Sequence, residues 1–297
     1  MKTRSEKNKN LINEEKKIKR DNRKKNFKKV LIVFLIIILL IVLYGFLVEP
    51  KMFRVNEEKI VSSEIPDSFH GVKIVHFSDL HYGSTINKNN IDKIVDKINL
   101  LKPDILIFTG DLIDNKYKLS KDDVDVLSKS LKKMNATLGK YSILGNHDFY
   151  VEEIDNIYFD SSFDLLVNEG DLVYYKENTP ILIYGVDDMI YGKPSIDPIK
   201  NDEYSNIPYK ILLTHEGDFI NSLGDYKFNL ILAGHSHNGQ VNIFKPMFLP
   251  EYSKHYYDSF YEKDGTLIYV SNGIGCSILP FRLGSIPSIN LYRLNTK

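Results

Sequence analysis

Short apolar runs alternate with helical patterns after the first seventy residues, and this alternation predicts an α/β domain. Residues 72–78, 104–109 and 141–144 are rich in β-branched and apolar side chains, which is typical of buried strands. Between them, residues 87–101 carry apolar side chains at helical spacing, and a second such pattern begins after Ser120, the expected N-cap. The resulting β-α-β-α-β order favours parallel strands joined by right-handed crossovers.

The second half of the domain is richer in strands, with one helical stretch around residues 219–223. We therefore expect an α/β fold of two packed mixed β-sheets flanked by helices. Strands are predicted at residues 165–167, 172–175, 181–186, 209–214, 229–233, 241–244, 257–261, 266–271 and 288–294.

The most apolar segment is Val30 to Val48, nineteen residues without a charge. At about 1.5 Å per residue, a helix of this length reaches roughly across the ~30 Å hydrocarbon core of a bilayer. A buried core helix would show a polar face, and a cleavable signal peptide would have a shorter apolar region that ends in small residues. We therefore predict one transmembrane helix that stays attached to the chain.

The distribution of charged residues also changes where this apolar segment begins. Residues 1–29 contain thirteen Lys/Arg and four Asp/Glu, whereas the whole chain has a formal net charge of zero. We predict a basic cytoplasmic tail at 1–29, an anchor at 30–48, a linker and domain entry at 49–69 and an extracytoplasmic catalytic domain at 70–297, because positive flanks stay inside. The tail either contacts anionic lipid or is solvated and disordered. The lone Cys276 excludes an internal disulfide framework.

Five polar blocks supply the candidate chemistry, and all but the last directly follow a predicted strand. Open α/β sheets gather ligands at such strand ends. Carboxylate, imidazole and amide groups without thiolates suit divalent ions such as Mn, Fe or Zn. Each block alone would be weak evidence, but the ordered set predicts a two-metal site. The blocks lie at residues 79–81, 110–111, 145–148, 214–215 and 234–240.

These blocks, in this order, resemble the calcineurin-like metallophosphoesterase superfamily over roughly residues 70–295. Gly234-His235-Ser236-His237-Asn238-Gly239-Gln240 and the single anchor resemble its bacterial membrane-associated branch, which includes YkuE-like enzymes and relatives of UDP-2,3-diacylglucosamine hydrolase. Relatives tend to have His-Gly-Gly-Gln and Pro-Glu-Ile, where this chain has His237-Asn238-Gly239-Gln240 and Pro287-Ser288-Ile289. Neither change removes a ligand, although both alter the expected pocket rim.

The resemblance implies two divalent ions that share the Asp111 carboxylate. One ion would be held by Asp79, His81, Asp111 and His237, and the other by Asp111, Asn146, His215 and His235. A hydroxide held between the ions would attack phosphorus in line.

Three further residues receive roles next to these ligands. His147 is expected to face the substrate as a general acid. Asp148 either orients the His147 ring or is an acid at a helix N-terminus. Arg282 could contact a phosphate, with a structural ion pair as the alternative. His76 is expected to be packed inside the domain, and His70 and His255 to lie on the surface.

Two apolar stretches, residues 150–159 and 244–250, belong either to the core or to a wall for acyl chains or membrane. The predicted function is an anchored phosphoesterase that cleaves a phosphodiester or pyrophosphate, with a lipid-linked or envelope substrate favoured. A broad phosphomonoesterase, a phosphoprotein phosphatase and a non-catalytic scaffold are the alternatives. The expected partners are a phosphorylated substrate and the membrane, through Val30 to Val48, and no nucleic acid.

Overall fold

The computed structural model describes residues 4–200 and 202–297, which divide into two units at Leu47 and Val48. The first unit is a continuous helix, α1 (Arg4–Leu47). Within the described residues, one helical segment, Asn13–Lys51, is long and apolar enough to cross a membrane. Its position agrees with the predicted anchor, whose side chains are exposed.

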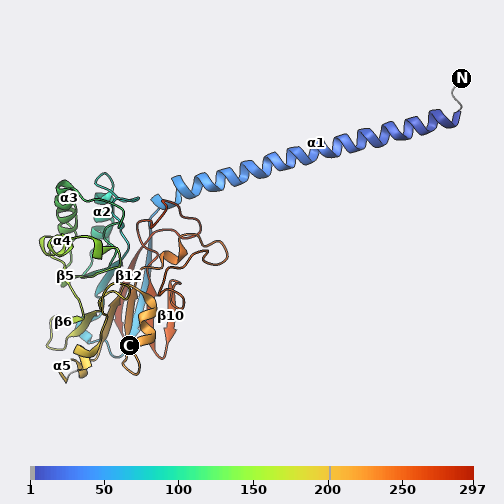
Figure 1. Ribbon diagram of the computed structural model, residues 1–297. Coiled ribbons are helices and arrows are strands. Elements are labelled where there is room, and N and C mark those ends of the chain that lie inside the picture. The colour runs from blue at the N-terminus through green and yellow to red at the C-terminus, as the bar shows by residue number, and fades with distance from the viewer. Residues whose placement is uncertain (1–3, 201) are drawn as a thin grey trace. The chain divides into compact units, whose positions relative to one another are not determined.

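Two six-stranded sheets form the second unit (Figure 1). The first sheet has the order β1-β12-β2-β3-β4-β5. Strands β2 to β5 run parallel, and β12 joins β2 in the antiparallel direction while pairing in parallel with β1. Its strands are β1 (Arg54–Ser62), β2 (Lys73–Phe77), β3 (Ile105–Thr109), β4 (Gly139–Ile143), β5 (Asp164–Leu165) and β12 (Ser288–Thr296).

The second sheet has the order β10-β11-β9-β8-β7-β6. Its four central strands are parallel and its two edge strands are antiparallel to their neighbours. Its strands are β6 (Glu169–Val173), β7 (Ile181–Gly185), β8 (Lys210–Thr214), β9 (Leu230–Ala233), β10 (Phe260–Lys263) and β11 (Thr266–Val270). The mixed two-sheet fold predicted from the sequence is confirmed.

Helices cover the outer faces of both sheets. The first sheet carries α2 (Ile91–Leu101), α3 (Lys121–Lys132) and α4 (Ile154–Asp160). The predicted N-cap Ser120 closes a full capping box with Asp123 at the start of α3. The shorter helical segments are η1 (Glu49–Lys51), η2 (Asp67–Phe69), η3 (Asp148–Tyr150), η4 (Asp197–Lys200), α5 (Asp202–Ser205), η5 (Gly217–Ser222) and η6 (His237–Gly239).

Three apolar layers follow from the alternation of side chains along the strands. On β3, Ile105 and Ile107 point between the two sheets, whereas Leu106 and Phe108 point toward the helices. The third layer lies on the outer face of the second sheet under η4 and η5. Both faces of β3 are therefore buried, which explains its uninterrupted apolar sequence.

The structure corrects two predicted strands and adds one that the sequence did not predict. Val241 and Asn242 form isolated bridges instead of a strand at 241–244, and the strand expected at 257–261 begins only at Phe260. Residues 49–69, expected as a linker and the entry to the domain, contain the strand β1, which pairs with β12 along its whole length. The helical stretch expected around residues 219–223 is present as the 3-10 segment η5.

The C-terminal ends of the parallel strands lie at one edge of each sheet. Strands β2, β3 and β4 run in register beside one another, as do β8 and β9. Loops that follow these five strands therefore meet at the same edge of the domain. This edge carries the polar blocks.

Ile107→Ala tests the intersheet layer, because Ile107 is fully buried between the sheets. We expect a loss of about 2–5 kcal/mol in unfolding free energy, since a cavity replaces the side chain. Urea denaturation of the detergent-solubilised chain measures this unfolding free energy. Val61→Ala on the half-exposed β1 is the control and should change stability by less than about 0.5 kcal/mol. Equal effects of the two changes would contradict this layering.

Candidate metal centre

The loops after β2 and β3 are bonded to each other by their backbones. The amide of Asp79 donates to the Gly110 carbonyl at 2.9 Å, and the amide of His81 donates to the Asp111 carbonyl at 3.1 Å. Two of the predicted polar blocks therefore form one unit at the sheet edge.

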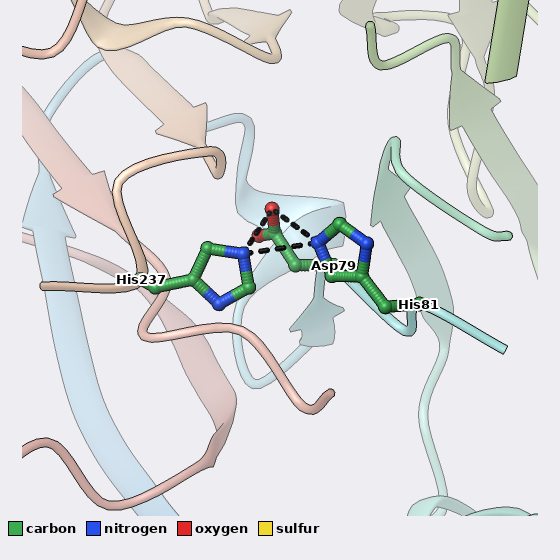
Figure 2. Close-up of side chains that lie close together, drawn as sticks. All are labelled: Asp79, His81 and His237. Carbon is green, nitrogen blue, oxygen red and sulfur yellow. Dashed lines mark hydrogen bonds and ion pairs between the residues drawn. The ribbon is translucent and has the colours of Figure 1, made fainter. Parts of the chain in front are cut away.

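A first donor group consists of Asp79, His81 and His237 (Figure 2). The two Nε2 atoms of His81 and His237 are 3.0 Å apart, and His237 Nε2 lies 3.3 Å from Asp79 Oδ1. Figure 2 shows the three side chains pointing toward one another, Asp79 and His81 from the loop after β2 and His237 from a second loop. Two imidazole nitrogens and a carboxylate oxygen converging in this way are suited to a divalent cation.

A second donor group consists of Asp111, His215 and His235. His215 Nε2 lies 3.3 Å from Asp111 Oδ2, and the rings of His215 and His235 are 4.9 Å apart between centroids. The same Asp111 Oδ2 atom lies 3.6 Å from His81 Nε2, which belongs to the first group. Asp111 thus stands between the groups, where the resemblance assigned the shared carboxylate.

Five of the seven predicted ligands have left-handed backbone conformations, with φ between 44° and 63°: Asp79, His81, Asp111, His235 and His237. Residues with a Cβ adopt this region at an energetic cost, and such residues cluster at functional sites. These sharp turns change the direction in which the side chains point after the strands have ended. The strand patterns therefore locate the ligands, and the strained turns orient them.

Neighbouring carbonyls fix the protonation of two imidazoles. His215 Nδ1 donates to the Thr109 carbonyl at 2.6 Å, and His235 Nε2 donates to the Glu251 carbonyl at 2.9 Å. In the neutral rings, the lone pair is therefore on the other nitrogen, which is Nε2 in His215 and Nδ1 in His235. Ligands of metal ions are commonly oriented by such bonds.

Arg282 binds the His237 ring and is completely buried. Its guanidinium donates to His237 Nδ1 at 3.1 Å and to carbonyls of Asn272, Gly275 and Ser285. Since it is enclosed behind a ligand, it positions His237, and neither the expected phosphate contact nor the alternative ion pair describes it. Position 282 follows the Gly-rich segment that also packs on Asp79, but no sequence signal distinguished this role.

Burial controls the charge of these groups. It lowers the pKa of His81 to about 3 and that of His235 to about 4, so both rings are neutral and able to bind a metal. Burial also opposes charging of His215 and Asp111, but their mutual attraction outweighs it: the pKa of His215 is raised and that of Asp111 is lowered. A cation bound here would compete with the proton on His215.

An unpartnered amide oxygen shows that the donor set suits a metal. The buried Oδ1 atom of Asn146 has no hydrogen-bond partner among the described residues. Such atoms are costly to bury unless something binds them. Asn146 follows β4 at the same edge, so its amide oxygen would complete the second group as predicted.

His147 has the most open side chain among the site histidines, with an exposed fraction of 12%. Its Nδ1 accepts from the amide of Asn115 at 3.1 Å, which places the proton of the neutral ring on Nε2. This Nε2 lies 4.0 Å from Asp111 Oδ2, so the N–H faces the donor groups. The placement is compatible with the expected contact to substrate.

Asp148 does not orient the His147 ring; it is the first residue of η3, so the alternative of an acid at a helix N-terminus describes its position. Its carboxylate accepts from the amides of Asp111, Leu112 and Gly145 at 2.8–3.0 Å. It is fully buried, so it has no access to a substrate. Asp148 instead ties the loop after β4 to the loop that carries Asp111.

Asp114 lies beside the site and was missed from the sequence. It forms a further donor group with His81 and His147, and its Oδ2 is 3.9 Å from His81 Nδ1. It follows Asp111 by three residues, a spacing that could have drawn attention to it. His76 is buried and bonded to Thr109, as expected, and His70 and His255 are exposed.

The comparison with known protein families agrees with this arrangement of donor groups. The model of the calcineurin-like phosphoesterase family matches residues 72–239, from β2 to the His237 turn. The chain belongs to this family. The matched segment contains all seven predicted metal ligands.

Similar proteins extend the likeness beyond that segment. The chain is 33% identical to the "Uncharacterized metallophosphoesterase YkuE" of Bacillus subtilis over 85% of its own length and 89% of that protein. It is 27% identical to the "Transmembrane protein with metallophosphoesterase domain" of Danio rerio, over 82% of this chain and 57% of that protein. The first of these supports the YkuE-like branch.

Among solved structures, the chain is similar to calcineurin-like phosphoesterase YfkN of Bacillus subtilis. That similarity has a TM-score of 0.43 and 14% identity, and it covers 69% of this chain and 82% of the other.

Gly110→Ala tests the close contact between the loops of this phosphoesterase. A Cβ at Gly110 would lie 2.5 Å from the Gly145 nitrogen and 2.8 Å from His215 Nδ1. We expect at least a tenfold loss of metal affinity, since the loops must separate and His215 must turn. Metal content after dialysis against buffered Mn²⁺ gives the measurement.

Gly71→Ala is the matched control, because its φ of 84° is close to the 87° of Gly110, but its Cβ would meet nothing within 4 Å. Both variants should lose about 1–2 kcal/mol from left-handed strain. Unchanged metal content in Gly110→Ala would refute the role assigned to the contact.

Proposed function

We propose that this chain is a membrane-anchored phosphoesterase that uses two divalent cations to cleave a phosphodiester or pyrophosphate bond. The observation that carries the proposal is the pair of donor groups that share Asp111, with Oδ2 within 3.6 Å of imidazoles from both. Asp79, His81 and His237 would hold one cation, and Asn146, His215 and His235 the other. When bound, such cations lower the pKa of water and offset charge on phosphorus.

The protein itself supplies orientation and one proton donor. The Arg282 guanidinium holds His237, the Thr109 carbonyl holds His215, and the Glu251 carbonyl holds His235. His147 presents its Nε2–H toward the shared carboxylate, so it would donate to the phosphoryl or leaving oxygen. Asn146 adds a neutral oxygen, which limits the negative charge that an anionic substrate meets.

The apolar helix supports a lipid-linked or envelope substrate. A segment of 39 residues, Asn13–Lys51, is able to cross a membrane by length and composition, and a similar protein is named as transmembrane. A catalytic domain held at a bilayer meets amphiphilic phosphoesters at high effective concentration. The basic residues before Val30 favour a cytoplasmic N-terminus and an extracytoplasmic domain.

The same metal groups would serve a broad phosphomonoesterase or a phosphoprotein phosphatase, so the alternative concerns the substrate. A non-catalytic scaffold has less support, because the chain retains every predicted ligand and an accessible His147.

Asp111→Asn should reduce hydrolysis of bis(p-nitrophenyl) phosphate by more than a thousandfold, because a neutral amide cannot serve both cations. His147→Gln should retain its metals and lose roughly 10²–10⁴-fold in kcat. Asp122→Asn, at an exposed salt bridge, is the control and should match the unaltered chain. Hydrolysis and metal content are measured with Mn²⁺ and with chelator. Full activity of Asp111→Asn would overturn the proposed site.

The matching monoester distinguishes the substrate classes. A higher kcat/KM for the diester than for p-nitrophenyl phosphate is expected. Preference for the monoester would favour the phosphatase alternative.

Protease treatment of spheroplasts tests the orientation. Residues 49–297 should be digested from outside, leaving the helix and the tail protected, because the positive flank remains in the cytoplasm. A cytoplasmic protein serves as the control for intact membranes. Complete protection of the domain would place it in the cytoplasm.

A further inference from the structure

Large apolar side chains are exposed in two loops of the second half of the domain. The first loop follows the His237 turn, and the second follows β11. Phe244 is 98% exposed and Ile278 is 78% exposed, values unusual for such side chains outside binding surfaces. We call this cluster the apolar rim; it consists of Ile243, Phe244, Met247, Phe248, Ile278 and Leu279.

The two loops form one surface because hydrogen bonds join them. The Gln240 side chain donates to the Ser277 carbonyl at 2.8 Å and accepts from the Ser277 amide at 2.9 Å. The amide of Asn242 donates to the Leu283 carbonyl, and the amide of Leu283 donates to the Gln240 carbonyl. The rim is thus fixed to the chain three residues after the ligand His237.

The chain enters the domain beside the same loops. Glu49, at the start of the second unit, accepts from the Ser285 amide at 2.8 Å, and Ser285 Oγ donates to the His237 carbonyl at 2.7 Å. Two hydrogen bonds therefore connect the entry point with a metal ligand. Figure 1 shows the orange and brown loops at the end of the domain where the pale-blue chain begins β1.

Strand register leads to the same placement. The first residue of β1, Arg54, pairs with Ser288, and the next residues of β12 pair with the C-terminal end of β2. The start of β1 consequently lies at the edge where β2 delivers Asp79. Entry point, apolar rim and metal centre share one edge of the domain.

We propose that the apolar rim inserts into the interface of the bilayer that holds α1, so that the metal centre opens at headgroup level. This inference rests on the anchored part of the proposed function. If α1 spans the bilayer through Val48, the chain leaves it one residue before Glu49, so the entry edge must lie at the membrane surface. Apolar and aromatic side chains at such a surface are stabilised by burial roughly 5–10 Å into the headgroup boundary.

The composition of the rim favours a bilayer as its partner. Exposed Lys245 lies between Phe244 and Met247 and is able to meet lipid phosphates. Ile278 has a φ of 66°, a conformation that is strained for a β-branched residue. Because this side chain does not pack in the core, the strain is explained if exposure of the side chain has a function. The substrate class is then an amphiphile whose phosphoester lies at the bilayer surface.

The chain contains no tryptophan, so a single introduced indole reports on one site. Phe244→Trp and Phe248→Trp place it in the rim. Tyr174→Trp is the matched control: Tyr174 is 56% exposed and follows β6, whose last residue pairs with the first residue of β7, at the opposite edge from the metal centre. The full chain is reconstituted into phosphatidylcholine–phosphatidylglycerol vesicles, with and without lipids brominated on the acyl chain.

The two rim variants should emit at shorter wavelength than the control and lose most of their fluorescence to brominated lipid, while the control is unaffected. Equal, unquenched emission of all three variants overturns the proposal. Short-wavelength emission of the rim variants without quenching also overturns it, because a second copy or another protein then covers the rim. Hydrolysis of the soluble diester by the same variants tests the proposed function separately.

Discussion

The hydrogen bond from His215 Nδ1 to the Thr109 carbonyl joins the two sheets at the edge where the chemistry gathers. Thr109 ends β3 in the first sheet, and His215 follows β8 in the second, so this bond closes the intersheet layer at its polar end. The bond also holds His215, which comes from the second sheet, with its Nε2 3.3 Å from Oδ2 of Asp111, which follows β3 in the first sheet.

Bringing buried carboxylates and imidazoles together is costly, and the surrounding chain offsets the cost. The carboxylate of Asp148 accepts three amides, and Asp79 accepts the amide of His235 at 3.1 Å. These bonds hold turns whose left-handed residues would otherwise relax. The buried Oδ1 atom of Asn146 remains without a hydrogen-bond partner among the described residues, and such an oxygen is a suitable ligand for a divalent cation. The donor set therefore suits a metal ion, whose binding would stabilise these loops.

The sequence predicted what depends on local pattern. Apolar runs located β2, β3, β8 and β9, and the strand ends then placed the ligands at one edge. It missed β1, because this strand is largely exposed and polar and its partner β12 lies more than two hundred residues away. The roles of Asp148 and Arg282 also depend on long-range contacts. Asp148 binds backbone amides of another loop, and Arg282 is enclosed behind His237.

The segment that the family model matches and the loops that form the apolar rim follow one another along the chain. The matched residues, 72–239, contain the ligands and end just before the loop that carries Phe244. Beyond them lie Arg282, which holds a ligand, and Ser285, which connects that ligand to Glu49 at the domain entry. The shared segment accounts for reaction at phosphorus. The later loops hold a ligand and contact the start of the domain, so under the proposed function they would select what reaches the metals.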